Sequence, residues 1–335
     1  MARALEARCL DLLCELGLAS EGDPVDVVPF DGGVASDIAR VDVAGQTFCV
    51  KFALEKLKVA EEWHVPVHRN RAEYAWLEFA ASVDPSSVPR LYGQSGTGFV
   101  MEHVASPDAF LWKDELLYGI PDIRHAVSVA DILARIHAAS VNSIHCQNSF
   151  RNHDDFLAIR IEPYLIFVAS RHPDLARQLN AIGEGLYRSR QALVHGDVSP
   201  KNILFRGNCP VLLDAECATM GDPAFDVAFC LNHLALKSIH RPDQRDVLMD
   251  AATGFWLTYA AGIAWEPCDA LEGRAAALLP VLLLARIDGK SPVEYLSREN
   301  QDRIRDLAKP LIRKPPARLD DVLTVVRQAG CPGDG

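Results

Sequence analysis

Positive charge is scarce in this sequence. Lysine and arginine number 34 and aspartate and glutamate 45, so the 335 residues carry a formal net charge of −11. A protein that binds the phosphate backbone of DNA or RNA presents a basic face. The acidic balance therefore argues against a nucleic-acid partner, and it is compatible with a neutral or cationic small ligand.

Paired cysteine motifs are missing as well. None of the nine cysteines belongs to a Cys-x-x-Cys motif or to a Cys/His spacing typical of zinc sites. Most of them, including Cys9, Cys14, Cys49 and Cys230, stand in apolar or helical contexts. We therefore expect reduced, mostly buried thiols and a cytoplasmic protein.

The sequence also has no long hydrophobic run. Residues 275–285 form the longest one, which is shorter than the roughly 18 residues of a membrane span, and Pro280 interrupts it. The first 19 residues are not typical of a signal peptide, because Glu6, Asp11 and Glu15 lie within the apolar pattern. We expect a buried helix at 275–285 and no membrane partner.

The length and the first hundred residues indicate two lobes with different structures. A chain of 335 residues is too long for one small core. Apolar spacing predicts helices over 1–18 and 69–82, and alternation predicts a hairpin over 38–52 that follows a glycine-rich turn. Two further short strands are expected within 88–104. We thus predict an α+β lobe over residues 1–101.

Residues 102–335 are predominantly helical in pattern. An amphipathic helix is predicted over 126–141, and 151–190 and 243–330 have helical spacing. Gly289 is expected to end one helix. Ser291 to Glu294, with Pro292 at the first helical position, is expected to cap the next. On this interpretation Arg286 and Lys290 are ordinary residues of a helix end rather than parts of a basic pocket.

Three polar side chains interrupt apolar segments in this second part. The stretch LVHGDVSPKNILF, residues 193–205, contains Asp197 and Asn202 between strand-like flanks, and Asp214 follows the apolar run at 211–213. A hairpin would bring Asn202 and Asp214 together as hard oxygen ligands suited to Mg²⁺. Asp197 would then be left to orient a hydroxyl and receive its proton.

This pattern resembles the aminoglycoside phosphotransferase-like families, which are small-molecule kinases with a bilobal, protein-kinase-like fold. His195-Gly196-Asp197-x-x-x-x-Asn202 followed by Leu213-Asp214 matches their catalytic and metal-binding loops. The resemblance covers roughly residues 25–240. It implies ATP and Mg²⁺ as cofactors, Asp197 as the catalytic residue, and Asn202 and Asp214 as metal ligands.

The resemblance also assigns the nucleotide contacts. Lys51 is similar to the strand lysine that contacts the ATP phosphates, and Glu73 to the glutamate that fixes this lysine, although Glu61, Glu62 and Glu78 are rivals for that position. Asp226 is similar to an aspartate that holds the catalytic loop in place. The remaining contacts would come from a phosphate-binding turn and from the hinge between the lobes: Gly32, Gly33, Ser36, Met101, Glu102 and His103.

Several alternatives stay open. His195 is expected to brace the loop rather than carry a proton, Lys201 is a weaker candidate for a phosphate contact, and His137 is expected to be a packed helix residue. The acceptor is expected to be a hydroxyl of a sugar-like or amino-alcohol metabolite, because residues 151–171 mix arginines with acids. Its pocket candidates are Asp154, Asp155, Arg160, Glu162 and Tyr164.

Three rival functions were weighed against this interpretation. An antibiotic-inactivating kinase of the same fold is the first alternative, and it would favour a ring of carboxylates around a cationic substrate. A catalytically silent nucleotide-binding protein would lack equivalents of Lys51, Asp197, Asn202 or Asp214, and all four are present. A protein kinase would carry His-Arg-Asp where this chain has His-Gly-Asp. We expect a monomer or a homodimer.

Overall fold

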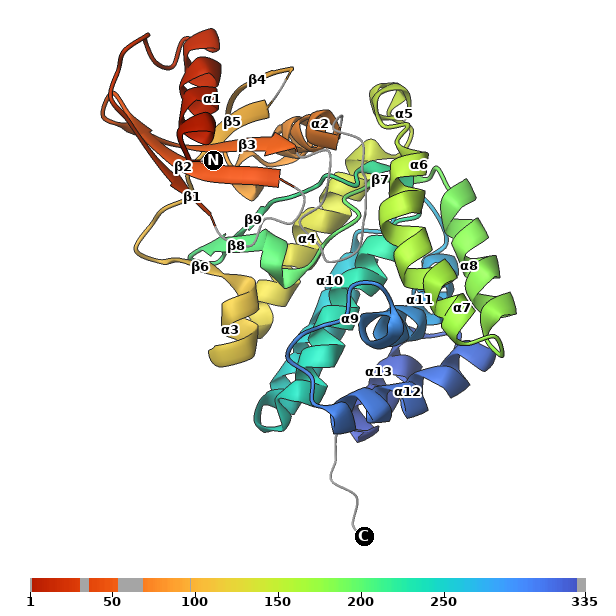
Figure 1. Ribbon diagram of the computed structural model, residues 1–335. Helices are drawn as coiled ribbons and strands as arrows, with labels where there is room; N and C mark the ends of the chain where they lie inside the picture. Colours follow the sequence, from red (N-terminus) through yellow and green to blue (C-terminus); the bar gives the residue numbers. More distant parts are fainter. Residues whose placement is uncertain (1, 31–35, 54–68, 97, 330–335) are drawn as a thin grey trace.

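The computed structural model describes residues 2–30, 36–53, 69–96 and 98–329 (Figure 1). A five-stranded antiparallel sheet forms the first part of the chain, in the order β1-β2-β3-β5-β4. Its strands and the two helices packed on it are α1 (Ala2–Glu15), β1 (Val25–Pro29), β2 (Ser36–Val43), β3 (Gln46–Ala53), α2 (Arg69–Val83), β4 (Leu91–Ser95) and β5 (Gly98–Glu102). The expected helices and strands are present, and β1 was not anticipated.

The β2–β3 hairpin is fixed by its turn. Val43 pairs with Gln46, and the two residues between them, Ala44 and Gly45, both have positive φ, of 50° and 75°. Such a two-residue turn matches the twist of antiparallel strands. It sets the register in which Lys51 lies opposite Ile38 on one side and Phe99 on the other.

Alternation along β3 gives the sheet two different faces. Phe48, Val50 and Phe52 pack with α1 in one buried cluster. Because successive side chains of a strand point to opposite faces, Cys49 and Lys51 lie on the other face. There Cys49 packs with Trp76 of α2. This arrangement carries a lysine into the space between the sheet and the rest of the molecule.

The second part of the chain is mostly helical (Figure 1). Its helices are α3 (Trp112–Tyr118), α4 (Ile123–Ser140), α5 (Ile144–Ser149), α6 (His153–Phe156), α7 (Phe167–Arg171), α8 (Ala176–Arg188), α9 (Ala224–His240), α10 (Arg245–Ala261), α11 (Cys268–Asp288), α12 (Arg298–Arg313) and α13 (Leu319–Ala329). Helix α9 is buried along almost its whole length and packs against α10 and α11.

Short strands bridge this helical part and carry its polar loops. They form a three-stranded sheet, β6-β8-β9, and a two-stranded sheet, β10-β7. Their bounds are β6 (Ala109–Leu111), β7 (Ala192–Val194), β8 (Ile203–Arg206), β9 (Cys209–Leu212) and β10 (Thr219–Gly221). Strands β8 and β9 make the hairpin expected between Asn202 and Asp214, with Ile203 paired to Leu212.

Helical spacing did not reveal a π-helix over Leu157–Ile166. Pro163 lies inside it and cannot donate a backbone hydrogen bond, which helps to explain why the chain departs from α-helical geometry there. The carbonyl of Pro163 accepts a bond from the amide of Lys290 at 3.2 Å. The wider turn places Arg160 and Tyr164 toward the interior, where both are buried.

The helix expected to start at Pro292 is absent, so that prediction was wrong. Gly289 does end α11, but the segment after it folds back on the helix, with the amide of Val293 bonded to the carbonyl of Arg286 at 2.9 Å. Helix α12 begins instead at Arg298, and the Ser297 hydroxyl accepts from the Asn300 amide at 3.2 Å. Val293 is buried in this arrangement. Tertiary packing of this kind overrides the local preference for a helix that the capping pattern indicated.

The apolar run at 275–285 is buried within α11, as expected. Among the described residues, no helix combines the length and the apolar character that crossing a bilayer requires. The division of the chain into lobes at residues 101 and 102 stays a prediction.

Candidate active site

Lys51 stands at the centre of a buried charge cluster. Its ammonium lies 2.8 and 2.6 Å from the two carboxylate oxygens of Glu73 and 2.5 Å from Oδ1 of Asp214. Lys51 and Glu73 are each 1 % exposed. Burial alone would lower the pKa of Lys51, but the carboxylates of Asp214 and Glu73 outweigh it and raise that pKa above its usual range. The lysine is therefore charged at any physiological pH.

Among the candidate glutamates that the structure describes, Glu73 is the one that contacts Lys51. Glu73 lies on α2 facing β3, whereas Glu78 on the same helix is exposed. Glu61 and Glu62 lie outside the described residues. Burial raises the pKa of Glu73 to about 7 against the opposing attraction of Lys51. The carboxylate therefore depends on its partner to stay ionised in this position.

Backbone hydrogen bonds fix the loop after β7. Asp226, at the start of α9, accepts the amide of His195 at 2.6 Å and the amide of Gly196 at 2.8 Å. The His195 ring accepts the Asp197 amide at Nδ1, 3.1 Å away, and its Nε2 donates to the Leu213 carbonyl, also at 3.1 Å. Burial lowers the pKa of His195. A neutral histidine thus braces the loop, as the pattern indicated.

Gly196 explains the His-Gly-Asp sequence. Its φ is +79°, and a Cβ placed there would meet the Cβ of Cys217 at 2.8 Å. Both observations disfavour any larger residue. Because the turn at Gly196 is this tight, the next residue, Asp197, is held with its side chain toward the helical part of the molecule.

Two cations hold the Asp197 carboxylate. Oδ2 of Asp197 lies 3.0 Å from Nη2 of Arg160 and 3.3 Å from Nζ of Lys201. Burial would raise the pKa of Asp197, but Lys201 and Arg160 outweigh it and bring that pKa well below its usual range. Asp197 is thus ionised and has little intrinsic basicity, which suits a group that orients a hydroxyl more than one that removes its proton early.

Arg160 was recognised from the sequence only as a pocket candidate. Its Nε also donates to the carbonyl of Gly196, and its guanidinium lies 5.8 Å from the centre of the Phe229 ring. It therefore fixes both the Gly196 carbonyl and the Asp197 carboxylate in the loop after β7. Lys201, by contrast, has a half-exposed side chain and reaches Asp197 from the loop itself.

His137 was expected to be only a packed helix residue. It lies within α4, fully buried, with Nδ1 2.7 Å from the hydroxyl of Tyr259 and Nε2 3.3 Å from Oδ2 of Asp226. It therefore supports the aspartate that holds the catalytic loop. The sequence pattern predicted that His137 lies on the buried face of α4, but it could not predict the contact with Asp226.

Asn202 and Asp214 meet at the base of the β8–β9 hairpin. The Asn202 carbonyl accepts the Leu213 amide at 2.9 Å, and the Asn202 amide nitrogen donates to the Asp197 carbonyl at 3.2 Å. Asp214 has φ of +66°, a strained conformation for a non-glycine residue that is typical of functional sites. The amide oxygen of Asn202 and the carboxylate of Asp214 are hard donors and fit Mg²⁺.

A cavity of about 640 Å³ lies beside Lys51, Lys201 and the base of the β8–β9 hairpin, and Asp197 is not part of its lining. Its lining includes Lys51, Glu73, Asn202 and Asp214 together with Ser36 and the residues expected at a hinge, Met101, Glu102 and His103. The amide of Glu102 already donates to the Arg90 carbonyl at 2.8 Å, and its carboxylate holds Arg206 at 2.7 Å. Gly32 and Gly33 lie outside the described residues.

The described residues contain no group of three or more histidine, cysteine, aspartate or glutamate side chains arranged to hold a metal ion by themselves. A cation at Asn202 and Asp214 would thus need further oxygen ligands from water or phosphate. Mg²⁺ is commonly bound in this way, with few protein ligands. The donor set therefore fits a metal that arrives together with a nucleotide.

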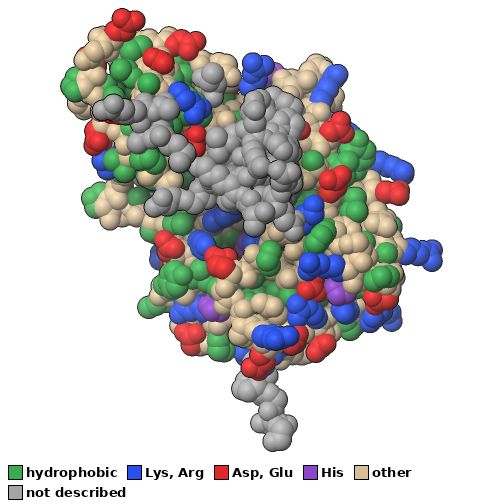
Figure 2. Space-filling model, viewed as in Figure 1, with side chains coloured by type: hydrophobic (Ala, Val, Ile, Leu, Met, Phe, Trp, Pro, Cys, Tyr) green, Lys and Arg blue, Asp and Glu red, His purple; other side chains and the backbone are tan. Residues whose placement is uncertain are grey.

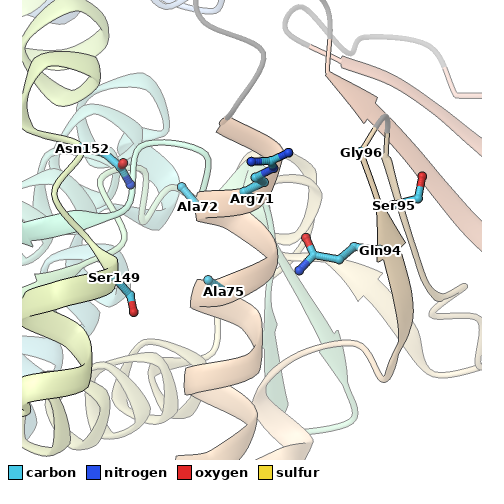
Figure 3. A pocket seen from close by; sticks show the side chains of 8 residues that line it. All are labelled: Arg71, Ala72, Ala75, Gln94, Ser95, Gly96, Ser149 and Asn152. Carbon is cyan, nitrogen blue, oxygen red and sulfur yellow. The ribbon is translucent and has the colours of Figure 1, made fainter.

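A second cavity, of about 510 Å³, lies between α2, the β4–β5 hairpin and the α5–α6 connection (Figure 3). None of the eight described residues that line it carries a carboxylate. They are Arg71, Ala72, Ala75, Gln94, Ser95, Gly96, Ser149 and Asn152. The chemistry described above therefore belongs to the cavity that contains Lys51 and Asp214.

Comparison with known proteins identifies the relatives of this chain. A model of the phosphotransferase enzyme family matches residues 26–265. No curated protein matches the sequence. Among solved structures, a choline kinase from Cryptosporidium parvum is similar with a TM-score of 0.56 and 11 % identity, covering 97 % of this chain and 100 % of its own.

Two further structures share the fold. A choline/ethanolamine kinase family protein from Mesorhizobium loti has a TM-score of 0.52 and 18 % identity over 97 % of this chain and 99 % of its own. An amicoumacin kinase, solved in complex with AMP-PNP, Ca²⁺ and Ami, has a TM-score of 0.54 and 13 % identity over 89 % of this chain and 91 % of its own. The predicted protein-kinase-like α+β fold is confirmed.

Proposed function

This chain belongs to the phosphotransferase enzyme family, and on that premise we propose that it transfers the terminal phosphoryl group of ATP to a hydroxyl of a small molecule. The observation that carries the proposal is the contact of Lys51 with Glu73 and Asp214 in a cavity that Asn202 also lines. The solved amicoumacin kinase, which was captured with a nucleotide analogue and Ca²⁺, supports ATP and a divalent cation as the cofactors.

Each side chain has a part in this proposal. Lys51 would contact the phosphates, while Glu73 keeps its ammonium in place. Asn202 and Asp214 would hold Mg²⁺, which neutralises phosphate charge when bound. The backbone around Met101 to His103 would position the adenine. Ser36 would lie near the phosphates together with Gly32 and Gly33.

Asp197 would orient the acceptor hydroxyl and take its proton late in the reaction. The transition state of phosphoryl transfer is loose, so positioning and charge neutralisation contribute more than strong base catalysis. An aspartate whose pKa is lowered by Lys201 and Arg160 fits that role. Arg160 would be a positioning residue, because it holds the carboxylate and the loop carbonyl.

The test is a measurement of ADP release from MgATP with a panel of alcohols, amino alcohols, sugars and aminoglycosides. We expect release that depends both on Mg²⁺ and on one class of acceptor. An enzyme that binds MgATP but releases no ADP with any acceptor would instead support the catalytically silent alternative. Cytoplasmic location and a monomeric or homodimeric state stay predictions.

A further inference from the structure

A basic cluster lies next to Asp197 in the helical part of the molecule. We define it as His233 and Lys237 of α9, Arg286 of α11, and the tyrosines Tyr164 and Tyr295. Asp226, His233 and Lys237 are spaced by seven and four residues, so they follow one face of α9. The face that holds the catalytic loop therefore continues, over roughly 16 Å of helix, to a buried lysine.

Lys237 has no carboxylate partner within the described part of the chain. It is 2 % exposed, and its ammonium lies 5.1 Å from the centre of the Tyr295 ring. Burying an ammonium without an ion pair costs free energy, and lysines are almost never fully buried unless they are paired. Burial, together with Arg286 and Lys113, lowers the pKa of Lys237 to about 7.

Other members of the cluster also have unused polar atoms. Nε of Arg286 and the hydroxyl of Tyr295 are buried and have no hydrogen-bond partner among the described residues. Nη1 of Arg286 reaches the Tyr164 hydroxyl at 3.1 Å and the Ser291 hydroxyl at 3.0 Å. Within the same part of the chain, the groups that bond this arginine are neutral. Unsatisfied buried donors of this kind are uncommon and call for a physical explanation.

The cluster is electrostatically continuous with the candidate active site. His233 is buried, and its pKa is lowered by burial and by the charges of Lys237 and Arg286, with Asp197 acting in the opposite direction. Lys113, which lines the nucleotide cavity, also acts on Lys237. The nearby carboxylate Glu294 is largely exposed and is paired with Lys113 at 2.8 Å. Cationic groups thus outnumber carboxylates on this side of Asp197.

We propose that the acceptor is an alcohol that also carries an anionic group, a carboxylate or a phosphate, which binds to Lys237 and Arg286 while its hydroxyl lies against Asp197. This inference rests on the proposed function and specifies the substrate class of the same site. It differs from the expectation that Arg286 is an ordinary residue of a helix end, which stays the alternative that the experiments below test. An anion would supply Lys237 with its missing counter-charge and accept bonds from the unused donors of Arg286 and Tyr295.

The basic cluster is an interior feature. On the face shown in Figure 2, acidic and basic side chains are interspersed over the helical part of the surface. A general attraction for polyanions would need a broad basic surface. A buried lysine beside a partly buried arginine favours a small anion next to the loop that carries Asp197.

The first experiment measures turnover with acceptors matched in carbon skeleton. Glycerol, glycerate, glycerol 3-phosphate and ethanolamine form one set, and glucose, gluconate, glucose 6-phosphate and glucosamine form another, with kanamycin and choline added. We expect the highest kcat/KM for an anionic member, at least tenfold above its neutral and cationic counterparts. Comparison of gluconate with glucose 6-phosphate distinguishes a carboxylate from a phosphate.

The outcomes separate the two proposals. Turnover confined to neutral or cationic alcohols overturns the inference and leaves the proposed function intact. Absence of turnover with every acceptor overturns both.

The second experiment compares Lys237→Met with Lys314→Met, which removes an exposed lysine at the end of α12. We expect Lys237→Met to raise the KM for the anionic acceptor at least tenfold, with the KM for ATP unchanged and Lys314→Met like the wild type. Lys237→Arg should recover much of the loss. Circular dichroism shows whether Lys237→Met is folded. An unchanged KM for the anionic acceptor in the folded variant would overturn the inference. If Lys237→Met does not fold, the same measurement is made on Lys237→Gln.

Discussion

The two sides of Asp197 differ in how their buried charges are balanced. On the nucleotide side, Lys51 contacts two carboxylates, and the site is electrostatically satisfied in the structure as it stands. On the other side, within the described residues, Lys237 and Arg286 contact aromatic rings and hydroxyls and no carboxylate. Buried charges are costly unless they are compensated. Under the two proposals, the nucleotide side is pre-organised by its own side chains, whereas the acceptor side receives its counter-charge from the ligand.

Replacement of Asp197 should have the largest effect, because both sides of the site converge on it. We expect Asp197→Asn to lower kcat by about 10²–10⁴-fold, the range typical of a lost general base. Since Asp197 is held by Arg160 and Lys201 rather than by Lys51, the dissociation constant of MgATP should stay within about twofold. Steady-state kinetics and calorimetric titration measure the two quantities. Full activity of Asp197→Asn would remove this residue from the reaction.

Removal of Lys51 should leave the buried carboxylates on the nucleotide side without their cation. Lys51→Met leaves Glu73 buried without a cation, and breaking such a pair costs about 3–5 kcal/mol. We expect urea unfolding to show a loss of that order, and kcat/KM for ATP to fall as well. The double variant Lys51→Met/Glu73→Gln should recover part of the stability. Equal stability of the single and double variants would contradict the ion-pair account.

Removal of Lys237 should have the opposite effect on stability. The pKa of Lys237 in the folded protein, about 7, lies below its unfolded value near 10.5, so the folded state binds fewer protons between these values. The cost of burying Lys237 is therefore complete below pH 7 and shrinks as the pH rises toward 10. We expect Lys237→Met to raise the unfolding free energy by about 1–4 kcal/mol at pH 6, with a smaller gain at pH 9. A destabilised variant at pH 6 would contradict this.

The smallest expected effect concerns the pH dependence of Asp197. Burial raises its pKa, but Lys201 and Arg160 lower it more, so the carboxylate should stay ionised through the acid range in which the protein is folded. Arg160→Met removes one of these cations, and the pKa of Asp197 should rise. We expect kcat/KM of Arg160→Met to fall at acid pH values at which the wild type, still folded, keeps its full kcat/KM. Arg188→Met, on the exposed face of α8, is the control.

The sequence predicted the local structure around Lys51, Asn202 and Asp214 better than the structure around Lys237, for a physical reason. Lys51, Asp197, Asn202 and Asp214 stand in short local patterns whose strands and turns follow from alternation and glycine positions. Glu73 could be recognised as the partner of Lys51 only from the contact between them. Local patterns were thus sufficient to predict the two hairpins and the turn at Gly196.

The acceptor side depends on tertiary packing that no local pattern contains. Arg160 and Tyr164 reach the interior through a π-helix, and Arg286 is met by a segment that folds back instead of starting a helix. Lys237 stands in a helix whose pattern is that of a buried core helix, although a lysine eleven residues beyond Asp226 and four beyond His233 was a usable signal. The spacing could have identified Lys237 as a charged residue on the buried face of the helix. It could not have shown that Lys237 lacks a carboxylate partner within the described residues.

The most direct test of the central claim follows the phosphoryl group itself. Phosphorus NMR of a mixture of enzyme, MgATP and the best acceptor should show ADP and a new phosphate monoester growing together. The same mixture with Asp197→Asn should show neither at a comparable rate. Formation of ADP and inorganic phosphate alone, or equal formation of the ester by Asp197→Asn, would contradict the account of this site.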